Sequence, residues 1–261
     1  MSNSVISLGL GLGGGKAATS SGRPAGGGVF TNIRSVSFDG TDDFFNTNST
    51  FQSTFQSSYT FSFWCKLNST SGTQFFFSAQ NGLNTDRVAC FLSGGRIALF
   101  ATSNGVGTAS IFDTSGTTLT NWFNVVGRFE QSGSNVIKTL FVNGSQKSTS
   151  TKAGMTLSQY GTVNTPVNIY AGARNFNNTP SFFTNGLMDE IALFGSALSA
   201  DDIASIYNSG VPADLSSFSP VAWFRMGDIN GGSGTTIANQ GSGSVDGELI
   251  NGPTYTTDIP S

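Results

Sequence analysis

The sequence contains no histidine, so it lacks the residue that most often serves as a general base or as a zinc ligand. Catalytic arrangements of the Ser-His-Asp and Cys-His kinds are excluded for the same reason. Carboxylates are the groups left for hydrolysis, and the glutamates are only Glu130, Glu190 and Glu248. We therefore do not expect an enzyme.

Charge is also scarce. Charged residues make up 10% of the chain and the formal net charge is −3, where about 25% charged residues is usual. The basic residues form no cluster that could neutralise a phosphate backbone or an anionic lipid surface, so we expect no nucleic-acid partner and no membrane partner. Weak net charge gives weak repulsion between copies, which suits a protein that works in an assembly or in a salty medium.

Cysteines and long apolar runs are few. Cys65 and Cys90 are the only cysteines, and each falls in step with an alternating apolar pattern, which predicts buried free thiols. A single disulfide between them stays open as an alternative if their strands are neighbours. No run of 18 apolar residues occurs, so no segment is predicted to span a bilayer.

Residues 1–28 are rich in glycine and serine. No basic residue precedes their short apolar stretch, so this segment does not match a signal peptide. We interpret it as a flexible N-terminal arm that orders against a partner, with a disordered tail as the alternative.

Glycine (34 residues) and phenylalanine (23 residues) dominate the remainder, with Ser, Thr and Asn left to form the surface. Residues 29–261 are predicted to form one all-β domain, an antiparallel two-sheet sandwich, because short apolar segments of period 2 alternate with turn residues. The predicted strands are 35–39, 59–67, 74–79, 86–92, 95–101, 107–112, 122–130, 136–143, 145–150, 166–173, 186–194, 220–226 and 246–250.

Two turns and one helix are predicted from local signals. Ser93-Gly94-Gly95 and Asn143-Gly144 suit hairpin turns because these residues tolerate positive φ. A short helix is expected near 199–209, with Ser199 as its N-cap and two aspartates in its first turn.

Four segments resemble the laminin-G-like, concanavalin A-like jelly-roll family. They are SVSFDGTDDFF (35–45), YTFSFWCKL (59–67), WFNVVGRFEQSGSNVIKTLFVNGSQ (122–146) and NGLMDEIALFGSALSADDIASIYNSG (185–210). The family usually has one or two histidines after the tryptophan of the third segment; here Phe123 and Asn124 follow Trp122, so no role of those histidines transfers.

The C-terminal segment 220–252 resembles the strand and Gly-rich loop that more often open such a domain. We expect it to pair beside the early strands and close the sandwich. The arm, the His-free, Phe-rich sandwich and this closing segment are together similar to decoration, tail or fibre proteins of tailed phages.

Acidic residues raise two questions, catalysis and calcium. Asp189 and Glu190 are adjacent on a predicted strand and are expected on opposite faces, and no acids alternate along one strand as in the glycosidases of this fold. Asp189 shares its parity with Leu187 and Ile191, so we expect it on a core face, compensated by amides or hydroxyls. The alternative is a structural Ca²⁺ with Asp228 as second ligand.

Further candidate sites are weighed against ordinary roles. The turn 39–43 carries three aspartates but lacks EF-hand spacing, which favours an Asp-capped turn over a calcium site. Trp64 is either an exposed sugar-stacking platform or a buried strand residue. The amide-rich segment with Arg174, Asn175, Asn177 and Asn178 is either a surface for sugars or proteins or a plain loop.

The leading hypothesis is a non-enzymatic structural protein of a phage virion, a capsid decoration or tail-fibre module that assembles with other virion proteins and with itself as a homo-oligomer. Adhesion to host-surface glycans is an additional activity left open by this hypothesis. The alternative is a lectin-like carbohydrate-binding module of a secreted or cell-surface protein, which would be extracellular. No cofactor is expected beyond the possible structural calcium.

Overall fold

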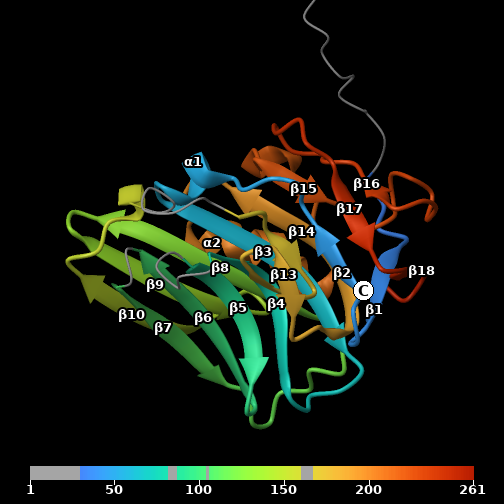
Figure 1. The fold of residues 1–261 in the computed structure, drawn as a ribbon, viewed down its shortest axis with the longest axis horizontal. Coiled ribbons are helices and arrows are strands. Elements are labelled where there is room, and N and C mark those ends of the chain that lie inside the picture. Colours follow the sequence, from blue (N-terminus) through green and yellow to red (C-terminus); the bar gives the residue numbers. More distant parts are fainter. Residues whose placement is uncertain (1–29, 82–86, 104–105, 160–166) are drawn as a thin grey trace, which may run out of the picture.

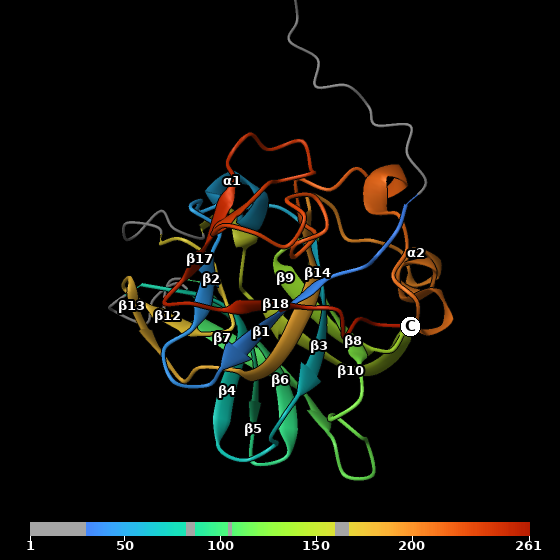
Figure 2. The ribbon, with the colours of Figure 1, turned by 90° about the vertical axis from the view of Figure 1, so that its right-hand side faces the viewer.

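The computed structural model describes residues 30–81, 87–103, 106–159 and 167–261, arranged as a two-layered β-sandwich (Figure 1). The expected N-terminal arm, residues 1–28, lies outside the described residues. Figure 2 shows the helix α2 (Ala200–Tyr207) and the hairpin of β12 (Arg174–Phe176) and β13 (Thr179–Ser181) on opposite flanks of the molecule, with the sheets between them.

Each layer is an eight-stranded antiparallel sheet. Sheet A runs in the order β10 (Ser145–Ala153), β9 (Asn135–Val142), β8 (Phe123–Ser132), β3 (Tyr59–Leu67), β14 (Asn185–Phe194), β1 (Ser35–Asp39) and β18 (Thr254–Thr256), with β15 (Ala222–Phe224) also paired to β14. Sheet B runs β16 (Thr236–Ile237), β17 (Gly247–Ile250), β2 (Phe44–Asn46), β11 (Tyr170–Ala171), β4 (Thr73–Gln80), β5 (Arg87–Ser93), β6 (Arg96–Ser103) and β7 (Val106–Asp113). The other elements are α1 (Gln52–Phe55) and the 3₁₀ turns η1 (Leu157–Gln159), η2 (Asn208–Gly210) and η3 (Leu215–Phe218).

The predicted all-β sandwich is confirmed, as are its local signals. Gly94 and Gly95 turn β5 into β6, and Asn143 and Gly144 turn β9 into β10, all with positive φ. Ser199 caps α2 in a reciprocal capping box with Asp202. The strands predicted at 166–173 and 220–226 are too long, because only Tyr170–Ala171 and Ala222–Phe224 pair as strands there.

The C-terminal segment closes both sheets, as its permuted order predicts. β17 pairs with β2 in sheet B, and β18 pairs with β1 in sheet A. β15 pairs with β14 where β1 ends, so β14 changes its neighbour along its length.

Aromatic rings hold the two sheets together. Phe61 of sheet A stacks on Phe77 of sheet B with ring centroids 4.3 Å apart, and Phe63 packs on Phe76 at 5.6 Å. Gly127 makes room for this stack, because a Cβ there would lie 2.6 Å from the Phe61 ring. Such buried aromatic pairs each contribute roughly 0.5–1.5 kcal/mol beyond the area that they bury.

A bulge in β4 divides three consecutive phenylalanines between two environments. The register with β5 shifts between Phe75 and Phe77. Phe76 and Phe77 point into the core, whereas Phe75 lies on the outer face of sheet B, stacked on Phe91 at 4.7 Å. The bulge therefore couples the core to the outer surface of this sheet.

The strand β7 of sheet B meets β10 of sheet A at one side of the sandwich. The Ser110 hydroxyl donates to the Lys138 carbonyl at 2.9 Å and also lies 2.9 Å from the Ser150 hydroxyl. The Ile111 amide donates to the Ser148 hydroxyl at 3.2 Å. Serine side chains therefore join the two strands in a seam.

Both cysteines are free and buried, which confirms the thiol prediction over the disulfide. Cys65 lies on β3 of sheet A and Cys90 on β5 of sheet B. Burial raises the pKa of both thiols, so they are inert core residues. Among the described residues, no helix combines the length and hydropathy that a bilayer crossing requires.

Lys138 breaks the apolar pattern of β9. It shares its parity with Val136 and Leu140 of the core, it is fully buried, and its Nζ has no hydrogen-bond partner among the described residues. Burial, with a smaller effect of Lys152, lowers the pKa of Lys138 to about 8. An enclosed, unpaired ammonium group opposes folding.

We predict that Lys138→Met stabilises the protein, because methionine keeps the aliphatic stem and removes the charge. At pH 7 its melting temperature is expected to rise by roughly 2–4 °C, the equivalent of about 1 kcal/mol. The pKa of Lys138 is lower in the folded state, so the wild type recovers stability as the pH rises from about 8 towards 10.5, and the gap narrows. Exposed Lys147→Met is the control; an equal shift in both variants, or a lower melting temperature for Lys138→Met, contradicts the prediction.

Candidate functional site

A shallow hollow of about 340 Å³ opens where the β1–β2, β3–β4 and β13–β14 connections meet. This volume is at the lower end of the range of small-ligand pockets. Hydroxyl and amide side chains and two aromatic rings line it: Gly40, Ser69, Ser71, Thr73, Gln74, Phe182, Phe183 and Asn185. We call it the Phe182 hollow.

The polar wall of the hollow is fixed by one buried glutamine. Gln74 Nε2 donates to the carbonyls of Ser69 (2.7 Å) and Ser71 (3.1 Å), and its Oε1 accepts from the Asn185 amide at 2.9 Å. The hydroxyls of Ser69 and Ser71 lie 2.8 Å apart at the rim. Gln74 thus cross-links two of the three connections and presents hydroxyl groups in a set geometry.

Gly40 is required by the close approach of the turns. Its φ is +79°, and a Cβ on it would lie 2.7 Å from the Asn185 Cβ. A larger residue would push the β1–β2 turn away from β14 and widen the hollow.

Phe182 is an aromatic residue held in an unusual backbone conformation. Its φ is +52°, its side chain is 48% exposed, and its carbonyl accepts from the Phe75 amide at 3.0 Å. Its ring rests against Phe75 at 5.9 Å, which in turn stacks on Phe91. A bulky residue with positive φ is a conformational outlier, and such strain concentrates at binding sites.

The segment 174–178 is a β-hairpin and not a plain loop. Asn177 and Asn178 form its tip, both with positive φ and both exposed. Arg174 lies over the ring of Phe176 at 4.8 Å and faces Phe182 at 5.8 Å. Arg174 is therefore placed next to the hollow, and Asn177 and Asn178 lie on the surface at the tip of the same hairpin.

Asn175 is not a ligand contact, because it is fully buried with its hydrogen bonds used internally. Its Nδ2 donates to the Asn168 carbonyl at 2.6 Å and its Oδ1 accepts from the Asn178 amide at 2.7 Å. The prediction that all four polar residues form the surface is wrong at this position, where the side chain fixes the hairpin.

The interpretation of Trp64 as an exposed sugar-stacking platform is also wrong. Its side chain is 2% exposed and stacks on Tyr207 of α2 at 5.7 Å. The residues Ile203 and Ile206 place α2 over this face of sheet A, and the helix covers the tryptophan.

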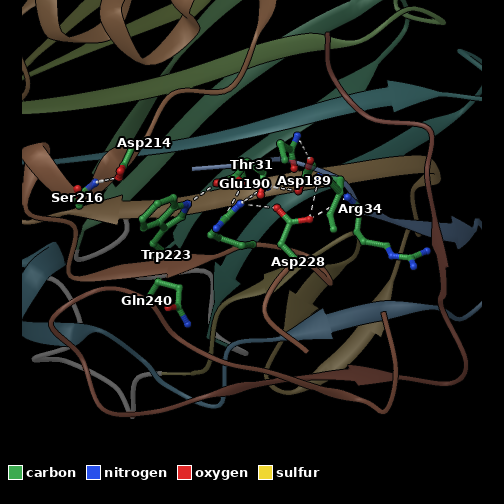
Figure 3. A network of polar contacts seen from close by, with 12 residues as sticks. Thr31, Arg34, Asp189, Glu190, Asp214, Ser216, Trp223, Asp228 and Gln240 are labelled. Carbon is green, nitrogen blue, oxygen red and sulfur yellow. Dashed lines mark hydrogen bonds and ion pairs between the residues drawn. The ribbon is translucent and has the colours of Figure 1, made fainter. Parts of the chain in front are cut away.

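Asp189 and Glu190 do not follow strand alternation, because β14 contains a bulge after Asp189 and Glu190 has a φ of +49°. Met188 before the bulge and Ile191 after it both point into the core. Asp189 pairs across from Trp64 and so lies on the face of sheet A opposite to Met188 and Ile191, not with Ile191 as its parity predicted. It is fully buried and accepts hydrogen bonds from the Asn32 side chain and the Glu190 amide, which agrees with the predicted compensation by amides. The two carboxylates, predicted on opposite faces, join one polar network (Figure 3).

Arg225 is the centre of this network. Its Nε contacts Glu190 at 3.3 Å, and its terminal nitrogen reaches Asp228 Oδ2 at 2.5 Å and the Thr31 carbonyl. Trp223 Nε1 donates to the other Glu190 oxygen. Asn32 Nδ2 donates to Asp189 at 2.9 Å, so the network fastens the segment 30–34 onto sheet A.

Burial is the main cause of the raised pKa values of Asp189 and Glu190. It raises the pKa of Asp189 well above its ordinary value, with a further contribution from the Glu190 charge. Burial also raises the pKa of Glu190 to about 7, although Arg225 and Trp223 favour its ionised form. Shifts of this kind occur at active sites, yet neither acid lines the Phe182 hollow.

The calcium hypothesis for Asp189 and Asp228 stays a prediction. Asp228 Oδ1 accepts from the amides of Ile33 and Arg34, at 3.0 and 2.8 Å, and Oδ2 pairs with Arg225, so a guanidinium already supplies the positive charge there. In the turn 39–43, Asp39 Oδ1 accepts from the Thr41 and Asp42 amides, which confirms an Asp-capped turn. Carboxylate oxygens of Asp39, Asp42 and Asp43 lie within 4.8 Å of one another.

Gln74 and Phe182 were missed by the sequence analysis. Gln74 stands within a predicted strand and gives no local signal of a buried cross-link. Phe182 follows Pro180 and Ser181 in a phenylalanine pair that the alternating pattern leaves outside any strand, and such an aromatic residue in a connection was the available signal.

Comparisons with known proteins agree with this architecture. A family model of the concanavalin A-like lectin/glucanases superfamily matches residues 39–204. No curated protein matches the sequence.

Among solved structures, the Ruminococcus gnavus IT-sialidase CBM40 bound to α2,3-sialyllactose is similar, with a TM-score of 0.56 and 14% identity over 68% of this chain and 100% of that one. A Bacteroides ovatus protein provisionally assigned to carbohydrate binding has a TM-score of 0.60 and 14% identity over 88% of this chain and 62% of that one. A leech intramolecular trans-sialidase has a TM-score of 0.55 and 16% identity over 69% and 28%. At these identities the likeness concerns the fold.

We predict that Glu190→Gln changes the pH dependence of stability. The pKa of Glu190 is about 7 in the folded protein and 4.5 as its ordinary value, so the folded state holds the proton more tightly between these values. The stability contributed by Glu190 is fully present below about pH 4.5 and is lost as the pH rises to 7. Relative to Glu190→Gln, the wild-type melting temperature is expected to fall by several degrees across this window.

Exposed Asp214→Asn serves as the control for that series of melts. A constant difference in melting temperature between wild type and Glu190→Gln from pH 4.5 to 7.5 contradicts the prediction.

The calcium hypothesis is tested by melting the wild type in millimolar calcium and in chelator. It requires a higher melting temperature with calcium.

Proposed function

The chain belongs to the concanavalin A-like lectin/glucanases superfamily, and from that premise we propose that it is a non-catalytic carbohydrate-binding module that holds a glycan at the Phe182 hollow. The observation that carries the proposal is the exposed Phe182 ring, fixed at positive φ beside a wall of hydroxyl and amide groups.

The chemistry of the hollow suits a sugar. The apolar face of a pyranose stacks on an aromatic ring, while its hydroxyls exchange hydrogen bonds with Ser, Asn and Gln side chains. Phe182 supplies the ring, Ser69 and Ser71 supply exposed hydroxyls, and Gln74 keeps the wall in place. None of the residues that line the hollow is a carboxylic acid, and the buried acids Asp189 and Glu190 lie in the separate Arg225 network, so binding without hydrolysis is the activity that we infer.

The similar structures support this proposal. One is a sialidase carbohydrate-binding module in complex with sialyllactose, and another is assigned to carbohydrate binding. A module of this kind acts outside the cell, and we propose an extracellular setting.

The proposal predicts that Phe182→Ala lowers glycan affinity at least tenfold, which corresponds to about 1.4 kcal/mol of lost stacking. A glycan array identifies bound oligosaccharides, and isothermal titration then measures each variant. Ile111→Ala is the matched control, because Ile111 on β7 is also 48% exposed. Wild-type affinity in Phe182→Ala would direct attention to a second hollow of about 440 Å³ beside α1, lined in part by Phe51 and Ser53, and would overturn the assignment to Phe182.

We further propose that the carrier of this module is a tailed-phage particle, in which it contacts other virion proteins and copies of itself as a homo-oligomer. The low charge of the chain supports this setting, because many neutral polar surfaces can then be packed together without repulsion. Mass spectrometry of purified particles is expected to detect the chain at many copies per virion. Its absence from the particles, with secretion by a bacterial host, would favour the cell-surface setting.

A further inference from the structure

Two arginines lie beside Gln80 on the outer side of sheet B, and one of them, Arg174, is next to the Phe182 hollow. Arg87 begins β5 directly across from Gln80 of β4, and Arg174 on β12 donates from its Nε to Gln80 Oε1 at 3.0 Å. Partial burial lowers the pKa of both side chains, and the positive charge of Arg174 lowers that of Arg87 further. Both arginines thus lie beside Gln80, and their charges are of the same sign.

Neither arginine has a carboxylate partner within the described parts of the chain, where the ion pairs involve Lys66 and Arg225. Arg87 Nε is enclosed and has no hydrogen-bond partner there. Two partly desolvated like charges with no counter-charge among the described residues are unfavourable there. An anion placed between them would relieve this cost.

Aromatic rings hold both guanidinium groups in place. The Cζ of Arg87 lies 3.7 Å from the centroid of the Phe100 ring, and that of Arg174 lies 4.8 Å from the centroid of the Phe176 ring. Stacking occupies the faces of a guanidinium and leaves its in-plane N–H donors for a ligand, which suits the bidentate capture of a carboxylate or sulfate.

The arginine pair is continuous with the hollow. Arg174 Cζ is 5.8 Å from the Phe182 centroid, and Phe182 itself lines the hollow. A sugar stacked on Phe182 would therefore hold a substituent on this side within reach of Arg174. Figure 2 shows the β12–β13 hairpin on the flank away from α2, so this face is separate from the Arg225 network on sheet A.

We propose that Arg87 and Arg174 form an anionic subsite that makes the module selective for acidic glycans, those that carry a carboxylate or a sulfate group. This inference rests on the proposed carbohydrate-binding function and specifies its ligand class.

The test is an array that carries each oligosaccharide in neutral, carboxylated and sulfated forms, among them lactose, 3′-sialyllactose and 3′-sulfolactose. The wild type is expected to bind acidic forms about tenfold more tightly than their neutral parents, as is typical of charge-assisted hydrogen bonds. The preferred acidic form distinguishes carboxylate from sulfate recognition. The preference for acidic forms is expected to decrease in 0.5 M NaCl, because dissolved ions screen the attraction between the arginines and the anionic group.

Arg174→Gln and Arg87→Gln are expected to abolish this selectivity while leaving affinity for neutral forms unchanged. Arg96→Gln, which removes an exposed side chain from the same sheet, is the matched control and keeps the selectivity. Melting curves verify that each variant is folded, and the selectivity of Arg87→Gln decides the test if Arg174→Gln is not folded.

The outcomes separate the two proposals. Equal binding of neutral and acidic forms by the wild type overturns the anionic subsite and leaves the carbohydrate-binding function intact. Retention of selectivity in both glutamine variants also overturns it. Failure of the wild type to bind any oligosaccharide overturns the proposed function and the subsite together.

Discussion

The division of Phe75, Phe76 and Phe77 at the bulge of β4 determines how the interior and the candidate site are connected. Phe76 and Phe77 stack against Phe63 and Phe61 and so set the spacing of the two sheets. Phe75 emerges on the other side and supports Phe91 and Phe182. The candidate site is therefore backed by the same short segment that fills the core, so the Phe182 ring rests on a rigid support.

A second bulge, in β14, has a different consequence. It brings Asp189 and Glu190 to the outer face of sheet A at the point where β14 exchanges β1 for β15 as its neighbour. The position lacks a continuous strand on that side, and side chains from residues 30–34 and from Arg225 occupy the space. Perturbed acids are therefore found where the chain is fastened, away from the candidate site. Their raised pKa values reflect burial in a joint between segments.

The elements predicted correctly from the sequence are those in which the local residue pattern matches the environment of the residues in the folded protein. Alternation identified β3 in full, the glycine and asparagine turns identified two hairpins, and Ser199 identified the start of α2. Alternation also caused the errors. A bulge shifts the phase of every residue after it, so the faces of Asp189 and Glu190 were wrong, and no local signal reveals whether a helix distant in sequence will cover Trp64. Of the predicted surface residues, Arg174, Asn177 and Asn178 are on the surface; Asn175 is not, because its amide completes the hairpin.

The serine seam between β7 and β10 affects how copies of the chain can meet. The outer strand of a sheet normally presents unsatisfied amides and carbonyls, which can template a strand from another molecule. In this chain the hydroxyls of Ser148 and Ser150 engage β7, so the last strand of each sheet is committed to the other. These contacts cover part of this edge and oppose edge-to-edge pairing between copies of the chain, which disfavours the merging of their sheets into fibrils.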